Sequence, residues 1–311
     1  MGLFEKPALK RLPVDAPIED FISAIEKDGG CIVTNYISLS DLAKANAEVK
    51  PYLDADKPWQ GKMFPPETRR CYRLLSNSPT CREKMFMHPL YQALGEHFLA
   101  ETNPTWYDEK CYYYTSHPLL SAALGIDVRP GAVGQRLHRD DKMYHTVHSD
   151  ATKTGYTKNR DNGFGVFIPG IQMTEKNGAT RMIPGSHLWG DSHGANTKDA
   201  IYACLCPGEA FFMLASTFHG GSTNHTASEN RLLYVLFMCK GTLRSEFALH
   251  LEYPPEVARH FGKDVQARLG YKISSPNCGM VDMRDPGWLL EEKVEGEGDE
   301  VGIRDPDPDN E

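Results

Sequence analysis

The sequence predicts a mainly β protein with flanking helices, in which short strands form a jelly-roll-like double-sheet barrel. Helix-periodic segments dominate the first hundred residues. After Trp106 the chain changes to short apolar segments rich in β-branched and aromatic residues, which favour strands. Turn residues separate these segments. A helical start followed by many short strands is typical of a double-sheet barrel with helices packed against it.

Three segments in the first hundred residues have the spacing and end signals of helices. Between 18 and 27, apolar residues recur every three or four positions, and Gly29-Gly30 ends the pattern. The other two are expected from Ser38 or Ser40 to about Lys50, where Pro51 should end the helix, and over 89–100. A final helix is expected within 254–269.

Eight segments have the composition of strands. They are 31–36, 111–115, 122–128, 164–168, 171–174, 179–183, 209–215 and 231–239. Asn177-Gly178 predicts a hairpin between the fifth and sixth of them, because both residues tolerate positive φ. The Pro-rich stretch 52–80 and the polar stretch 141–163 lack either period. We interpret them as functional loops, the first as a lid beside a pocket.

The chain has an uneven distribution of charge. Residues 291–311 contain ten acidic and two basic residues, which account for the whole formal net charge of −8. The other 290 residues carry 32 acidic and 32 basic side chains, so no basic face for a nucleic acid is expected. We predict a single domain over 1–290, followed by a disordered acidic tail over 291–311.

Cysteine spacing and the start of the chain indicate the compartment. The eight cysteines form no CxxC pair, and the first residues contain no long apolar segment. These features favour reduced thiols in a cytoplasmic protein without a membrane anchor.

Two motifs and one arginine carry the chemistry. His138 and Asp140 are two residues apart, so on an extended strand their side chains point to the same face. His219 is followed by two glycines, which let the backbone approach another group closely. Arg231, twelve residues later, opens an apolar strand and offers a fixed cationic fork for a carboxylate. Together they predict a 2-His-1-carboxylate metal site with an anion anchor.

These motifs resemble those of the phytanoyl-CoA dioxygenase-like iron(II)/2-oxoglutarate oxygenases. The likeness is closest to the fungal branch that modifies secondary metabolites such as meroterpenoids and alkaloids. It spans roughly residues 17–285, and its N-terminal third matches loosely. The matching segments are 130–131, 135–140, 175–180, 184–189, 207–209, 219–221 and Arg231.

The resemblance implies a double-stranded β-helix of the cupin type and a role for each matching residue. His138, Asp140 and His219 correspond to the ligands of Fe(II) and hence to the catalytic residues. Arg231 corresponds to the partner of the distal carboxylate of 2-oxoglutarate. Gln135 and Thr180 correspond to its lesser polar contacts. Several relatives carry paired arginines near Arg231, whereas this chain has Asn230-Arg231.

The implied reaction consumes O2 and 2-oxoglutarate and oxidises a small hydrophobic substrate of natural-product biosynthesis. Hydroxylation, desaturation, rearrangement and endoperoxide formation all fit, and the carboxylate of Asp140 favours oxygenation over halogenation. Relatives are often homodimers, so a homodimer is expected. An acyl-CoA or fatty-acid substrate remains an alternative, because Lys142, Lys153, Lys158 and Arg160 could bind a CoA thioester.

Other protein classes were weighed against this hypothesis. The His138-Arg139-Asp140 tripeptide also occurs in protein kinases, but the other kinase motifs are absent from the chain. A zinc hydrolase could use the same three ligands, although it has no need of Arg231. A non-catalytic jelly-roll binding or partner subunit is the remaining alternative.

The remaining polar and aromatic residues near these motifs have weaker claims. Solvent exposure is expected for His145 and His148, with substrate contact as the alternative, and hydrogen bonding within its own turn is expected for His187. Arg139 should point away from the ligands, and Arg70 and Arg73 should form surface pairs. One or two of Tyr112, Tyr113 and Tyr114 should face the barrel interior. The residues that could line an apolar pocket are Trp59, Met63, Phe64 and Tyr144.

Overall fold

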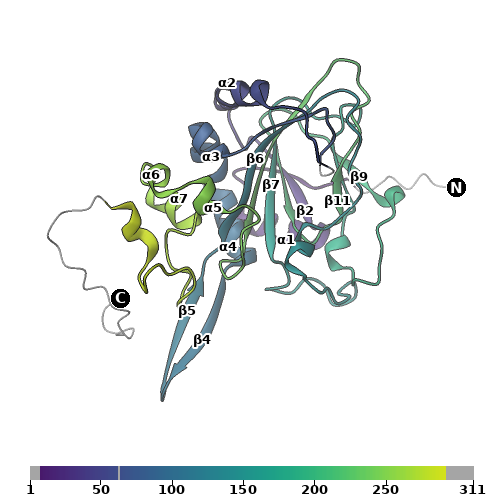
Figure 1. The fold of residues 1–311 in the computed structure, drawn as a ribbon. Helices are drawn as coiled ribbons and strands as arrows, with labels where there is room; N and C mark the ends of the chain where they lie inside the picture. The colour runs from purple at the N-terminus through teal and green to yellow at the C-terminus, as the bar shows by residue number, and fades with distance from the viewer. Residues whose placement is uncertain (1–7, 62–63, 292–311) are drawn as a thin grey trace.

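The computed structural model describes residues 8–61 and 64–291. Its strands are β1 Arg11–Pro13, β2 Gly30–Thr34, β3 Thr68–Cys71, β4 Glu101–Tyr107, β5 Lys110–Ser116, β6 Leu119–Val128, β7 Gly163–Pro169, β8 Thr180–Met182, β9 Ile201–Ala203, β10 Ala210–Leu214, β11 His219–Gly221 and β12 Arg231–Cys239. Seven strands form a large sheet in the order β1-β2-β10-β7-β12-β6-β3, and three form a smaller sheet in the order β11-β8-β9. The hairpin β4-β5 stands apart (Figure 1). This is the predicted jelly-roll class.

Helices gather at the start and the end of the chain. The α-helices are α1 Ile18–Asp28, α2 Leu39–Ala55, α3 Leu74–Asn77, α4 Pro89–Leu99, α5 Leu249–Glu252, α6 Pro255–Ala258 and α7 Lys263–Arg268. The 3-10 and π turns are η1 Cys81–Phe86, η2 Asp140–Tyr144, η3 Ser186–Leu188, η4 Thr197–Asp199 and η5 Pro286–Leu290. No described helix is both long and apolar enough to cross a membrane.

The large sheet is covered on both faces, and the alternation of side chains along each strand produces two cores. On β7, Phe164 and Val166 point toward the layer that holds α1, α2 and α4. The intervening Phe167 points toward the smaller sheet. Because residues of period two share a face, an uninterrupted apolar strand serves both cores at once. The core between the two sheets is the one that contains the pocket described below.

The three helices predicted in the first hundred residues are confirmed as α1, α2 and α4, but the predicted end of α2 at Pro51 is wrong. Gly29 ends α1 with φ 80°, and the Ser38 hydroxyl caps α2 by accepting from the amide of Asp41 at 3.0 Å. Pro51, however, lies inside α2 and does not end it. The helix continues because Val49 and Leu53 pack into the core, and their burial outweighs the hydrogen bond that proline cannot donate.

Asn177-Gly178 forms a turn but not the predicted hairpin. Thr174 and Ala179 close the turn through a backbone hydrogen bond of 2.9 Å. The segments on either side both pair with the 201–205 region, Met173 with Leu205 and β8 with β9. They are therefore successive parts of one strand edge, interrupted by a loop.

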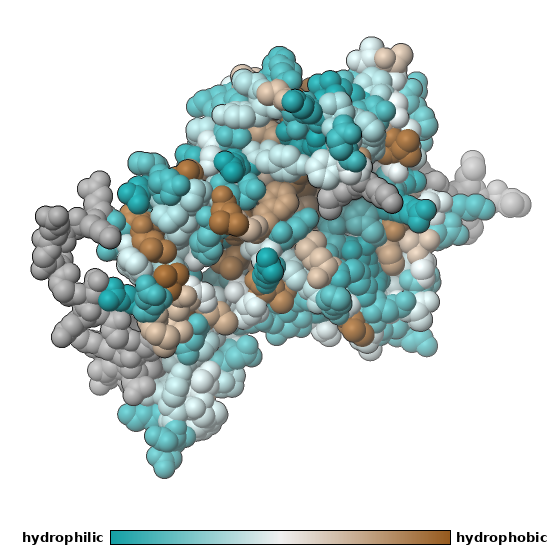
Figure 2. All heavy atoms as spheres, in the orientation of Figure 1, coloured by the Kyte–Doolittle hydropathy of each residue, from teal (hydrophilic) through white to brown (hydrophobic). Residues whose placement is uncertain are grey.

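The tyrosines of β5 do not face the barrel. The strands β4 and β5 form a two-stranded hairpin that projects from the body of the molecule (Figure 1), and its tip is hydrophilic (Figure 2). Tyr113 is 72% exposed. The prediction that one or two of these aromatics face the interior is wrong, because the hairpin pairs only with itself.

The stretch 52–80 is less irregular than predicted, since it contains β3 and α3. The helix expected within 254–269 is divided into α6 and α7, and Gly262 precedes α7. All eight cysteines are unpaired, as expected. The predicted disordered tail lies outside the described residues apart from Glu291.

Candidate functional site

A cavity of about 380 Å³ opens between the two sheets. Its wall includes Arg231, Leu233, Val235 and Phe237, which alternate along β12 and therefore share one face. Opposite them on β6 are Val128, Ile126, Leu124 and Ala122, in register. The molecular face in Figure 2 is mostly hydrophilic, with hydrophobic residues gathered near its centre and toward one side. The cavity is thus a mainly apolar pocket inside a polar surface.

His138, Asp140 and His219 come together on the wall of this cavity. The segment that holds His138 pairs with the start of β11, and the two histidines exchange backbone hydrogen bonds of 2.9 Å. Asp140 lies just beyond this bridge, where its amide donates to the carbonyl of Ala215 at 2.9 Å. Its two carboxylate oxygens reach Nε2 of His138 at 3.3 Å and Nε2 of His219 at 3.4 Å.

The two imidazoles are oriented so that their Nε2 atoms face the carboxylate. Nδ1 of His138 lies 2.8 Å from the carbonyl of Arg136, and Nδ1 of His219 lies 3.1 Å from the carbonyl of Thr217. A carbonyl can only accept, so each Nδ1 carries the proton. Each Nε2 therefore presents a lone pair when the ring is neutral, which is the tautomer that binds a metal.

Electrostatics agree with this arrangement. Burial would raise the pKa of Asp140, but the neighbouring His219 and His138 outweigh it and lower that pKa. Burial lowers the pKa of His219 and so favours its neutral form. Burial also acts to lower the pKa of His138, but the hydrogen bond and charge of Asp140 raise it. The set offers an ionised carboxylate and a neutral buried imidazole.

The donor set fits a divalent metal ion. One ligand atom from each residue lies within 4.8 Å of the others. The Oδ2 atom of Asp140 is buried without a hydrogen-bond partner, and a cation would satisfy it. Two nitrogens and one oxygen on one side of a pocket leave further coordination positions open toward the cavity, which is the facial arrangement of non-haem iron sites.

Arg231, Gln135 and Thr180 lie together on the wall of the same cavity. Arg231 is buried and donates from one guanidinium nitrogen to the carbonyl of Gly178, while its Nε has no partner. Burial lowers its pKa to about 10, so it remains cationic at neutral pH. The Gln135 amide oxygen accepts from the amide of Gly221 at 2.9 Å, which leaves the NH2 group as the end that can reach an anion.

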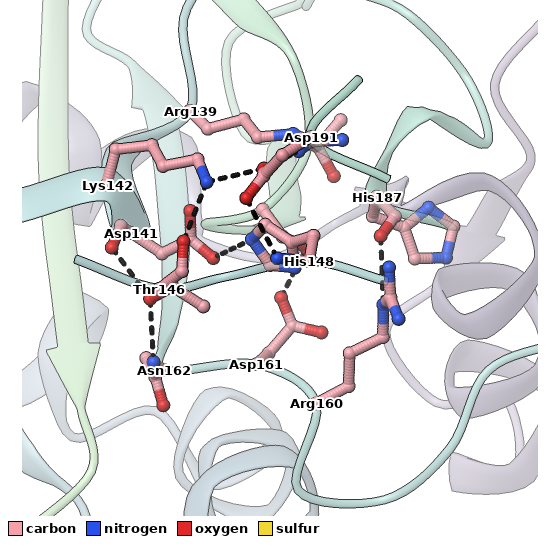
Figure 3. A network of polar contacts seen from close by, with 12 residues as sticks. Arg139, Asp141, Lys142, Thr146, His148, Arg160, Asp161, Asn162, His187 and Asp191 are labelled. Carbon is pink, nitrogen blue, oxygen red and sulfur yellow. Dashed lines mark hydrogen bonds and ion pairs between the residues drawn. The ribbon is translucent and has the colours of Figure 1, made fainter. Parts of the chain in front are cut away.

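Arg139 lies in a polar network with Asp191 (Figure 3) and does not line the cavity, as predicted. It donates to the carbonyls of Ser186 and Trp189 at 2.8 and 2.9 Å and pairs with Asp191 at 3.3 Å. Its guanidinium also lies over the ring of Phe218, 4.3 Å from the centroid. Each contact is structural, so Arg139 has no direct access to the pocket.

His148 is part of this network, and the prediction that it is exposed or touches substrate is wrong. It is buried and its Nε2 lies 2.7 Å from Oδ2 of the equally buried Asp141. The next buried carboxyl is Asp161, which accepts from Ser216 and whose pKa burial raises to about 6. These groups hold the stretch 141–162 against the barrel, so it is an anchored segment (Figure 3).

Several weaker expectations are also corrected. His187 bonds to the carbonyl of Glu26 in α1, outside its own turn, at 2.9 Å. Arg70 is buried and bonded to Asp56, so it is no surface pair. Tyr144 bonds to Ser121 and does not line the cavity. His145 is exposed as expected, Trp59 and Phe64 do line the cavity, and Met63 lies outside the described residues.

The sequence hypothesis missed some of the pocket. Tyr72, Glu246 and Phe247 line it but belong to no motif. Phe237 could have been found from the period-two alternation that starts at Arg231. The four basic residues considered for a CoA thioester do not line the cavity: Lys142 pairs with Asp191, and Arg160 donates to the carbonyl of His187.

The family model described as phytanoyl-CoA dioxygenase (PhyH) matches residues 25–232. The chain belongs to the phytanoyl-CoA dioxygenase family. It is accordingly an oxidoreductase of the dioxygenase class. The matched region contains His138, Asp140 and His219, called the triad below, together with Gln135, Thr180 and Arg231. It ends one residue beyond Arg231, so that Glu246 and Phe247 lie outside it.

Two fungal dioxygenases are similar to this chain over most of its length. The dioxygenase himG of Aspergillus japonicus is 32% identical over 96% of this chain and 95% of its own length. The dioxygenase peniF of Penicillium patulum is 33% identical over 88% of each.

Among solved structures, the non-haem, 2-oxoglutarate-dependent epimerase SnoN from nogalamycin biosynthesis superposes with a TM-score of 0.53. SnoN is 19% identical in sequence, and the match covers 74% of this chain and 85% of SnoN. HygX from Streptomyces hygroscopicus, solved with nickel and 2-oxoglutarate, gives 0.53 at 12% identity, covering 74% and 90%. At these identities the two structures support the fold.

Proposed function

We propose that this chain is an iron(II)- and 2-oxoglutarate-dependent dioxygenase that oxidises a small hydrophobic intermediate of natural-product biosynthesis. The reaction would be a hydroxylation, desaturation, rearrangement or endoperoxidation. Family membership, similar fungal dioxygenases and the fold of SnoN and HygX support this proposal.

One observation carries the proposal. Two Nε2 atoms and a buried carboxylate converge in the same apolar pocket that contains a buried, incompletely bonded arginine. A hydrolytic zinc site uses similar ligands but has no need of a fixed cation at one end of its pocket. A dicarboxylate that binds the metal through one end requires such a cation at its other end.

His138, Asp140 and His219 would hold the iron, which when bound supplies positions for 2-oxoglutarate and dioxygen and the oxidising power for C–H chemistry. Carbonyls of Arg136 and Thr217 fix the two rings in the ligating tautomer. Asp140 would supply the negatively charged ligand, which favours oxygenation over halogenation.

Arg231 would hold the distal carboxylate of 2-oxoglutarate, assisted by the Gln135 amide and the Thr180 hydroxyl. The guanidinium sits at the first residue of β12, where its backbone is fixed by pairing with Val128. The apolar residues that follow on β12 exclude water from the substrate side. An acyl-CoA substrate is less well supported, because none of the four basic residues considered for it lines this pocket.

The test is a cosubstrate assay that needs no knowledge of the substrate. Purified protein with Fe(II), 2-oxoglutarate and oxygen should release succinate slowly in the absence of substrate. Fe(II) titrated without oxygen should bind in a 1:1 ratio. Failure to bind Fe(II), or binding of 2-oxoglutarate that does not depend on the metal, would contradict the proposal. The homodimer and the cytoplasmic location stay predictions.

A further inference from the structure

Glu246 places a carboxylate at the edge of the apolar pocket. Its backbone amide donates to the Ser121 hydroxyl at 3.1 Å, and the amide of Phe247 donates to the Ser121 carbonyl at 3.0 Å. Ser245 bonds to the carbonyl of Leu120 at 2.7 Å. Three successive residues are thus tied to the start of β6, beside Ala122 of the pocket wall. The position of Glu246 is therefore fixed by the sheet.

Among the described residues, the Glu246 carboxylate has no hydrogen bond or ion pair, although it lines the cavity and is solvent-exposed at its mouth. Its neighbours on this part of the wall are apolar or aromatic, and the rings of Tyr72 and Phe247 lie 6.4 Å apart. Desolvation, and after it the charge of Asp140, raises the pKa of Glu246. Within residues 8–61 and 64–291, no cation pairs with this carboxylate.

The pocket has opposite charges at its two ends. Arg231 pairs in register with Val128 at one end of β6, and Phe237 pairs with Ala122 at the other. Six strand residues separate these ends, which is roughly 20 Å. The triad lies between them, since His219 packs against Phe167, whose register partner is Val235. The anion anchor and Glu246 are therefore on opposite sides of the metal ligands.

We propose that Glu246 selects a substrate with a protonated amine, so that the substrate is an apolar ring system carrying a basic nitrogen. This inference rests on the proposed function and names the substrate class of that site. The carboxylate provides the counter-charge, and the faces of Tyr72 and Phe247 suit a cation. From the middle of the pocket to Glu246 is about two strand residues, roughly 7 Å, so the oxidised carbon lies within one or two rings of the nitrogen.

The same geometry disfavours an anionic substrate. A fatty acid or a CoA thioester that enters past Glu246 would bring negative charge toward an unpaired carboxylate and toward Asp140. A neutral alcohol could hydrogen-bond to Glu246, but it would gain no charge interaction. The amine is the functional group that uses both the carboxylate and the aromatic rings.

The test compares two probes with the same apolar cage, 1-aminoadamantane, which is protonated at neutral pH, and 1-adamantanol. Their dissociation constants are measured by calorimetry on the protein loaded with Fe(II) and 2-oxoglutarate without oxygen, and again on the metal-free protein. Wild type should prefer the amine roughly tenfold, which is about 1.4 kcal/mol. Glu246→Gln keeps the shape and the hydrogen-bonding capacity, so it should bind the alcohol unchanged and lose the preference for the amine.

Glu256→Gln is the matched control, because Glu256 is exposed on α6 and does not line the cavity. It should keep the preference. Equal affinity of wild type for both probes, or a preference that survives in Glu246→Gln, would overturn the inference. Because binding is also measured without metal, an amine preference is observable even where the protein fails to bind iron. The failure of this inference and the failure of the proposed function are thus distinguishable.

Discussion

Each imidazole of the triad is oriented by a carbonyl two residues earlier in its own segment. Arg136 serves His138 and Thr217 serves His219. The ring positions therefore depend on local backbone, and the backbone bridge between the two histidines then sets their separation. Asp140 is held independently through its amide. These backbone contacts fix the positions of all three donors.

Replacing a ligand should abolish metal binding without unfolding the protein. His138→Ala and Asp140→Ala each remove one of three donors, and we expect no Fe(II) binding in an oxygen-free titration and no succinate release. His138 is only half-buried, so its removal should change the thermal midpoint little. His260→Ala, at an exposed position outside the cavity, is the control and should behave as wild type. Near-normal Fe(II) affinity in either ligand variant would contradict the assignment.

Arg231→Ala should weaken the binding of 2-oxoglutarate while Fe(II) still binds. Loss of a charge-assisted pair costs about 2–3 kcal/mol, which corresponds to roughly a 30- to 150-fold increase in the concentration of 2-oxoglutarate required. The measurement is succinate release against 2-oxoglutarate concentration, with Fe(II) affinity determined in parallel. Arg244→Ala, at an exposed position that does not line this cavity, is the matched loss of charge. An unchanged requirement would place the anchor elsewhere.

The convergence of His138, Asp140 and His219 in one cavity with Arg231 could be predicted, because the chemistry proposed for them demands particular residue types in this order. Glu246 could not, since it is a single glutamate in a loop whose position depends on contacts with Ser121. His148 was misjudged for a related reason. A histidine in a polar stretch looks exposed until its partner, Asp141, is known to be buried beside it.

At the level of elements, the stretch 141–162 is the least regular part of the barrel and one of the most tightly bonded. Asn162 donates to Thr146 at 2.8 Å, and Thr146 donates to the carbonyl of Asp141 at 2.8 Å. Asp141 and Asp161 are both fully buried in it. Because this segment follows Asp140 directly, its anchoring limits how far that ligand can move (Figure 3).

Asp161→Asn should stabilise the protein at neutral pH and have little effect in acid. Burial raises the pKa of Asp161 from 3.8 to about 6, so the folded state holds the proton more tightly than the unfolded state. Wild-type stability therefore falls as pH rises from about 4 to 6, by roughly 2–3 kcal/mol. Asparagine cannot ionise and still accepts from Ser216.

The measurement is denaturant unfolding of both proteins at several pH values. The difference in unfolding free energy between the variant and wild type should increase in favour of the variant between pH 4 and pH 7. A difference independent of pH would show that Asp161 does not titrate in this range.

Elements with a regular period could be predicted, and elements defined by distant partners could not. The helices α1 and α4 and the strands β7, β10 and β12 follow from periodicity and apolar runs. The three-residue strands β1 and β9 are defined only by their pairing with β2 and β8. The turn at Asn177-Gly178 is local, and its prediction is confirmed. The pairing of the segments on either side of it depends on residues 201–205 and could not be predicted.

At the level of the whole molecule, the described domain and the acidic end of the chain should be separable. Removing residues 291–311 takes away ten acids and two bases, which brings the formal net charge from −8 to zero. The shortened protein should elute from an anion exchanger at lower salt and precipitate more readily near neutral pH. Fe(II) and 2-oxoglutarate binding should be unchanged. Loss of Fe(II) binding would mean that the predicted boundary of the domain at residue 290 is wrong.

The strand order of the large sheet determines when the site can form during synthesis on the ribosome. His219 follows His138 by 81 residues, and β12, which carries Arg231, inserts between β7 and β6, both made earlier. A nascent chain that has reached only β10 holds two of the three ligands and no anchor. The proposed iron site can therefore be completed only after β11 has left the exit tunnel, and its anion anchor only after β12, so iron would be acquired late, by a chain that is almost finished.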